Sequence, residues 1–175
     1  MAKLRKMLGH ADDPEIIALM RLIETQSKAT LVKWSLSYAR DHFLPIYEAF
    51  NPEDRRPEAA LNAASGWLDK QVKLPDVKNA VREATNAAKE AEGHPAAQAA
   101  ARGISVAAAT IYSPTGALGM TFYGAAAIAY HREGLEQPAE IYDQIAHEEL
   151  NKMLEALQAV AITDEPNPVK INWNC

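Results

Sequence analysis

The chain has 175 residues, a formal net charge of −5 and a single cysteine. This length suits one domain with a sizeable core and is short for two. The cysteine, Cys175, excludes an intrachain disulfide. The first residues, MAKLRKMLGHADD, lack the apolar stretch of a secretory signal, so we expect a cytoplasmic protein.

The composition favours helices over strands. The 33 alanines far outnumber the 8 glycines and 3 phenylalanines, and alanine has the best helix propensity. A sheet protein would use more β-branched and aromatic residues. We therefore predict an all-α fold.

Prolines mark most of the helix starts, because proline suits the first position of a helix. The predicted helices span 14–26, 28–50, 57–70, 75–92, 95–112, 115–132 and 138–158. Short connections favour antiparallel neighbours, so we predict one domain, 1–175, built as an irregular bundle of about seven helices. The helical core is expected over 14–158 and an extended tail over 159–175, with Trp173 as the obvious anchor.

The segment from Gly103 to Tyr130 has no charged residue and is long enough to cross a bilayer. Ser113, Pro114, Thr115 and Gly116 divide it into pieces that are too short to span separately. We interpret it as a buried helical hairpin and expect no contact with a membrane.

The predicted helix 28–50 has large side chains on two sides. Val32, Leu36, Ala39, Phe43, Ile46 and Phe50 form one face. Trp34, Asp41 and Glu48 recur at seven-residue spacing on the other, with Tyr38 and Pro45 between them. If this helix is central, Asp41 needs a partner, and the nearest in sequence are Arg55 and Arg56. This cluster would fix a helical corner, line a ligand or partner site, or be exposed and inert.

The last predicted helix carries an unusual charge distribution. Residues 133–165 contain nine carboxylates and the single base Lys152. Glu149 falls on the inward face, where it would meet an arginine, sit at an edge or act in a cleft. The predicted partner-binding residues lie on and before the outer face: Glu136, Glu140, Asp143, Glu148 and Glu155. Such a surface repels nucleic acid and attracts a basic protein.

No catalytic motif is present. No histidine follows a glutamate by three positions, as a di-iron bundle would require, and Asn151 replaces the second histidine of a zinc-protease helix that would start at His147. A phosphate loop, a Gly-x-Ser-x-Gly elbow and a cysteine pair are also lacking. We therefore expect no catalytic residue, no metal and no cofactor.

One stretch has a recognisable order of elements. It contains Trp34 and Ala39, then FLPIYE over 43–48, the acidic turn 51–54, Arg56 and Pro57, and AALNAASGW over 59–67. With the alanine-rich segments 97–109 and up to Tyr130, it resembles the immunity proteins of bacterial polymorphic toxin systems, in particular the immunity-five-like helical family. Members of that family often carry histidines where this chain has Ile104 and Ile111, so a metal site there is not expected.

The resemblance implies a protein that binds and neutralises a co-produced toxin without catalysis. Many such toxins are nucleases with basic surfaces, which an acidic helix would complement. Two other functions remain open. One is a small-molecule-binding or catalytic protein with a pocket near Trp34, Tyr38, Asp41 and Arg56. The other is a helical oligomerisation module that uses the alanine-rich faces of 95–130 in a homo-oligomer.

Overall fold

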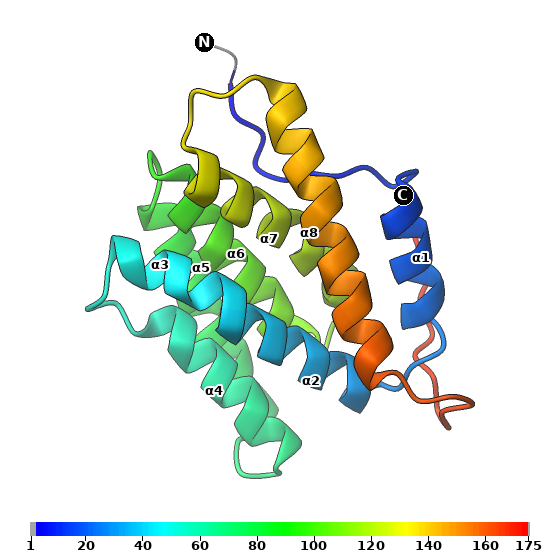
Figure 1. Cartoon of the computed structure of the whole chain (residues 1–175). Helices are drawn as coiled ribbons and strands as arrows, with labels where there is room; N and C mark the ends of the chain where they lie inside the picture. The colour runs from blue at the N-terminus through cyan, green and yellow to red at the C-terminus, as the bar shows by residue number, and fades with distance from the viewer. Residues whose placement is uncertain (1–2, 175) are drawn as a thin grey trace.

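The structure is a computed structural model that describes residues 3–174, so Cys175 lies outside the described residues. Residues 3–174 form an all-α bundle (Figure 1), which confirms the predicted fold class. It has seven helical segments when α2, η1 and α3, which follow one another without a break, are taken as one. The elements are α1 (Pro14–Ile23), α2 (Lys28–Tyr38), η1 (Ala39–Phe43), α3 (Leu44–Phe50), α4 (Arg56–Leu68), α5 (Leu74–Glu90), α6 (Pro95–Ala109), α7 (Gly116–Glu133) and α8 (Ala139–Val160). Each predicted helix is present, with small shifts at its ends.

The helix predicted over 28–50 contains a wider turn at its centre. It runs as α2, the π-helical turn η1 and α3. In a regular α-helix, Pro45 would offer no N–H to the carbonyl of Asp41, and its ring would clash with that carbonyl. The wider turn, in which the Leu44 N–H donates to the Ala39 carbonyl, relieves this conflict and adds one residue. Phe43 and Ile46, which belong to the predicted inner face, are buried on either side of Pro45.

The centre of the bundle is the hairpin of α6 and α7, as the charge-free segment predicts. Alanines on both helices are buried, including Ala100, Ala107 and Ala126, so the two backbones lie close together. Phe43 from η1 is fully buried against glycines of both helices, Gly103 and Gly124. None of the helices within residues 3–174 is long and apolar enough to cross a membrane.

Helices α4 and α5 cover one side of this centre. The inward stripe of α5 and its C-terminal end consists of Val77, Val81, Ala84, Ala88 and Ala91, which are all buried. Helix α3 lies against α6, and α4 packs against α5 and α6. The alanine-rich face of α6 is therefore covered largely by helices of the same chain.

Helices α1 and α8 close the other side, with the two terminal segments beside them (Figure 1). Leu8 of the N-terminal segment is fully buried, and its N–H donates to the Phe122 carbonyl at 3.2 Å. The tail after Val160 is extended and packs against the α1–α2 connection, where the Val169 N–H donates to the Gln26 carbonyl at 2.9 Å. Trp173 donates to Glu24, but it is one of several anchors.

Candidate functional site

The outward face of α8 is an acidic stripe. We define this stripe by the exposed residues Glu140, Gln144, Glu148, Asn151 and Glu155, which follow one another at three- or four-residue spacing. Its polar contacts are weak pairs along the helix, with Asn151 donating to Glu155 at 3.1 Å and Gln144 to Glu148 at 3.4 Å. These pairs remove no charge, so the stripe presents three carboxylates to solvent.

Two of the predicted partner-binding carboxylates lie close to arginines. Asp143 is half-buried at the edge of α8 and forms an ion pair with Arg5 from the N-terminal segment. Glu148 lies 3.7 Å from the guanidinium of Arg132. Exposed pairs of this kind contribute little to stability, but Asp143 presents less uncompensated charge than Glu140 or Glu155.

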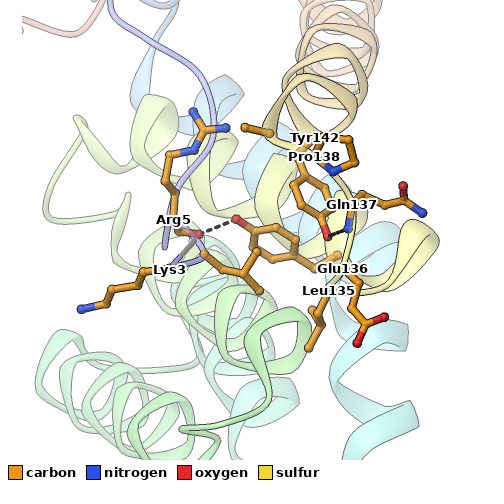
Figure 2. Close-up of a pocket in the computed structure, with 10 residues that line it drawn as sticks. Lys3, Arg5, Leu135, Glu136, Gln137, Pro138 and Tyr142 are labelled. Carbon is orange, nitrogen blue, oxygen red and sulfur yellow. Dashed lines mark hydrogen bonds between the residues drawn. The ribbon is translucent and has the colours of Figure 1, made fainter. Parts of the chain in front are cut away.

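Glu136 lies at a pocket between the N-terminal segment and the α7–α8 connection (Figure 2). The pocket has a volume of about 430 Å³ and is lined by Lys3, Leu4, Arg5, Tyr130, Leu135, Glu136, Gln137, Pro138, Ala139 and Tyr142. Its tyrosine rings meet edge to face, with centroids 4.9 Å apart. Most of the wall is apolar, and Glu136 is exposed beside it.

The two tyrosines hold the chain segments that form this pocket. The Tyr130 hydroxyl donates to the Arg5 carbonyl at 2.7 Å, and burial raises the pKa of Tyr130. The Tyr142 hydroxyl donates to the Gly134 carbonyl at 2.7 Å and accepts from the Gln137 N–H at 3.1 Å. These bonds fix the segment from Gly134 to Pro138, and with it the position of Glu136 (Figure 2).

Glu149 lies on the inward face of α8, as the helical period predicts, and is only 4% exposed. Its carboxylate accepts from the Lys152 ammonium at 2.8 Å and lies 3.6 Å from the Arg132 guanidinium. Burial raises the pKa of Tyr38, and the negative charge of Glu149 raises it further because it disfavours the phenolate. The negative charge of the buried Glu149 is thus balanced by Lys152 and Arg132, and Glu149 lies at the edge of a groove that is described below.

The predicted pairing of Asp41 with Arg55 or Arg56 is wrong. Asp41 is exposed, and no ion pair or hydrogen bond of its side chain is found within residues 3–174. The seven-residue spacing assumed a regular helix, whereas η1 adds a residue just at Asp41. Trp34 remains buried at 3% exposure, while Glu48, one turn beyond Pro45, is half-buried.

The two arginines bind other carboxylates. Arg55 pairs with Glu58 one turn along α4. Arg56 donates to Asp54 at 2.8 and 2.9 Å and to Glu90 of α5 at 2.6 Å. The Arg56 guanidinium is the main reason that the pKa of Asp54 is lowered to about 2. This network joins α3, α4 and α5. It therefore holds together the corner at which these helices meet.

Asp41 instead lies in a groove between the α2–η1 segment and α8. One hollow of about 640 Å³ is lined by Thr30, Lys33, Trp34, Ser37, Tyr38, Asp41, His42, Ala156, Ala159, Val160 and Ile162. A second, of about 650 Å³, is lined by Asp41, His42, Pro45, Ile46, Ile128, His131, Arg132, Glu149 and Lys152. Asp41 and His42 line both hollows, which together we name the groove, and Arg56 lines neither.

Several residues of these sites were not identified from the sequence. Asp54 stands two positions before Arg56 in the turn NPEDRRP, so this short-range pair could have been found. His42, His131 and Arg132 come together with Glu149 only through the packing of η1, α7 and α8. Arg5 and Asp143 are 138 residues apart, and nothing in the sequence alone indicates their contact.

No curated protein and no solved structure matches the chain. The model of one family, described as "Imm-5 like putative immunity protein", matches residues 21–156. The match takes in α2 to α7, the last three residues of α1 and all but the last turn of α8, and so includes the acidic stripe and most residues of the groove. Since it covers more than half of the 175 residues, the chain belongs to this Imm-5-like family.

Proposed function

We propose that the protein binds a cognate toxin and neutralises it by contact, without a reaction of its own. The observation that supports this best is the acidic stripe of α8, where three exposed carboxylates lie along one helix face within the family match. A buried structural role does not explain them, because these side chains contact only residues of the same helix or, for Glu148, the exposed Arg132.

The proposed contact surface consists of Glu136, Glu140, Glu148 and Glu155, with Asp143 at its edge. Carboxylates of one sign over an exposed helix raise the rate at which a basic partner associates, and salt screens this effect. A toxin with a basic substrate surface would be bound over that surface and prevented from reaching its substrate. Asp143 contributes less, since Arg5 already shares its charge.

The experiment begins with capture of the toxin from the source cells on the tagged chain. The captured protein is then expressed alone and together with this chain, and growth is measured. We expect growth arrest by the partner alone and recovery on co-expression. Capture only of further copies of this chain, or a captured partner that does not arrest growth, would contradict the proposal.

Charge reversal then locates the surface. The variant Glu140→Lys, Glu148→Lys, Glu155→Lys should bind the toxin at least tenfold more weakly, and its binding should lose most of its salt dependence. The matched control is Glu53→Lys, Asp69→Lys, Glu92→Lys, which changes three exposed carboxylates on connections away from α8. Equal loss in both variants would show that net charge alone matters and would reject this location.

A further inference from the structure

A further hollow, of about 410 Å³, adjoins the pocket beside Glu136, because Tyr130 and Leu135 line both. It lies between the end of α3, the connection that leads into α6, and the end of α7. The buried side chains in its lining are Ile46, Ala97 and Tyr130, and the exposed Leu135 stands at its edge. We name it the Leu135 hollow.

The lining of the Leu135 hollow contains no lysine, arginine, aspartate or glutamate. Its polar side chains are His94, His131 and Tyr130, and the Tyr130 hydroxyl already donates to the Arg5 carbonyl. A charged occupant would find no fixed opposite charge here, whereas an apolar group can enter without removing a charge from water. The lining therefore suits an uncharged, apolar occupant.

Leu135 is 40% exposed although its backbone is fixed. The Tyr142 hydroxyl bonds to the Gly134 carbonyl on one side of it and to the Gln137 N–H on the other. A side chain held in place in this way loses little conformational entropy when a partner covers it. Single exposed leucines are common on protein surfaces, but this one borders two hollows.

The Leu135 hollow is continuous with the proposed contact surface. Leu135 precedes Glu136 in the chain, and Figure 2 shows their side chains extending next to each other from the α7–α8 connection. Glu140, the first carboxylate of the acidic stripe, follows four positions later. An apolar hollow thus lies beside a row of carboxylates. Protein interfaces have this composition, with much of the binding energy in an apolar pocket and polar groups around it.

We propose that the cognate toxin inserts a large apolar side chain into the Leu135 hollow, next to a base that meets Glu136. The inserted side chain is uncharged because the hollow offers no fixed charge, and it stands on a basic surface because the adjoining carboxylates attract one. This inference rests on the proposed function. It adds an apolar anchor to a contact that is otherwise described by charge alone.

The first test measures the affinity of the captured toxin for Leu135→Ala at about 0.1 and about 1 M salt. We expect binding at least tenfold weaker at both concentrations, because salt reduces the Debye length from about 10 to about 3 Å but does not screen an apolar contact. The control is Ile162→Ala, which truncates a 51% exposed apolar side chain of the tail and should bind like the parent protein. A loss seen only at low salt would mean that Leu135 merely positions Glu136, and it would overturn the inference, as would an equal loss in the control.

The second test needs no toxin. N-acetyl-L-tryptophan amide is added to the isolated full chain, and NMR follows the Leu135 methyl and Phe50 ring protons. We expect saturable shifts centred on these groups, and binding about threefold to tenfold weaker for Leu135→Ala. Ala49→Trp keeps Leu135 but adds a ring at the exposed edge of the hollow, so it should prevent probe binding. N-acetyl-L-glutamine amide, which is uncharged but polar, should give no saturable shift.

The two proposals fail separately. No saturable shift with the tryptophan derivative, or equal shifts with the glutamine derivative, would overturn the inference. A chain that neutralises its toxin, and whose Leu135→Ala variant binds that toxin equally well, would retain the proposed function and exclude the apolar anchor. Probe binding by a chain that neutralises no toxin would contradict the proposed function, and with it the toxin as the occupant of the hollow.

Discussion

Phe43 lies against Gly124 so closely that a Cβ on the glycine would come within 2.1 Å of the Phe43 Cζ atom. Gly103 lies beside Gly124, and a Cβ there would come within 3.1 Å of the Phe43 Cδ2 atom and 3.6 Å of the Gly124 nitrogen. The two glycines thus form the seat into which η1 inserts its buried ring. This contact fixes the α2–η1–α3 segment, and with it Asp41 and His42, relative to the central hairpin.

Gly124→Ala should destabilise the protein by about 1–3 kcal/mol, the usual effect of overpacking a core. Alanine gains about 1 kcal/mol over glycine in helix propensity, but Phe43 is fully buried, so its ring has little room to move away from the new methyl group. Urea denaturation of the purified variant measures the change in the free energy of unfolding.

The control is Gly119→Ala, in the same helix. Its added Cβ would meet only the Cγ1 atom of Val106, at 3.1 Å, and Val106 is half-buried and able to adjust. We expect its stability to stay within about 1 kcal/mol of the parent protein. If Gly124→Ala were as stable as Gly119→Ala, the ring of Phe43 would not be seated as described.

Asp54→Asn should weaken the corner formed by α3, α4 and α5. The carboxylate accepts from the Arg56 guanidinium and from the Tyr47 hydroxyl at 2.6 Å, and its side chain is only 9% exposed. Its pKa in the folded protein is lowered from 3.8 to about 2, mainly by Arg56. A lowered pKa means that the ionised form stabilises the fold above pH 3.8 and that this contribution disappears as the pH falls through 2.

We therefore expect Asp54→Asn to lose about 1–2 kcal/mol of unfolding free energy at pH 7, and much less near pH 2. Denaturant unfolding at both pH values measures the difference. Glu53→Gln removes the neighbouring exposed carboxylate and should have little effect at either pH. A loss for Asp54→Asn that did not depend on pH would assign the effect to packing.

Local patterns were sufficient to predict the helices and most of their buried faces. The stripe from Val77 to Ala91 and the inward position of Glu149 follow from a 3.6-residue period, which needs no knowledge of the partner helix. The regular period is interrupted at the turn before Pro45, which adds one residue. Asp41, for which a partner was expected only if the helix buried it, is exposed at this turn.

The candidate sites were predicted only in part, because they depend on contacts distant in sequence. The exposed carboxylates of α8 were visible as a charge pattern. The groove, in contrast, needs η1, α7 and α8 to be brought together, and the pocket beside Glu136 needs Arg5 to reach Tyr130. No periodicity encodes these contacts, since they are set by the packing angles of whole helices.

Tyr142→Phe should loosen the α7–α8 connection. The lost hydroxyl removes the hydrogen bonds to the Gly134 carbonyl and from the Gln137 N–H, and a hydrogen bond of this kind contributes about 0.5–1.5 kcal/mol. We expect lower thermal stability and faster hydrogen exchange at the Gln137 amide. Tyr123→Phe is the control, because no hydrogen bond of the Tyr123 hydroxyl is found within residues 3–174. Similar exchange rates at the Gln137 amide in both variants would contradict the role of Tyr142.

Glu165→Gln should release the C-terminal tail from the start of α2. The carboxylate accepts from the Ser27 N–H at 2.8 Å, the Ser27 hydroxyl at 2.7 Å and the Thr30 hydroxyl at 2.6 Å. A carboxylate at a helix N-terminus is favoured by the unpaired N–H groups there. The amide keeps the shape but loses the charge and one acceptor, so we expect a loss of about 1 kcal/mol.

The readout is hydrogen exchange at the Val169 amide, which is protected by its bond to the Gln26 carbonyl. Partial burial raises the pKa of Glu165, but the hydrogen bonds from Ser27 and Thr30 outweigh it and lower the pKa overall. The stabilisation that ionised Glu165 gives to the fold is therefore present above the pKa of this group in the unfolded chain and is lost in acid. Val169 protection in the parent protein should fall at low pH toward that of Glu165→Gln. The control is Asp164→Asn, which makes an equal charge change on the adjacent exposed residue. This variant should retain full Val169 protection at neutral pH. An equal loss of protection in Asp164→Asn would show that the tail responds to net charge instead of to the Glu165 carboxylate.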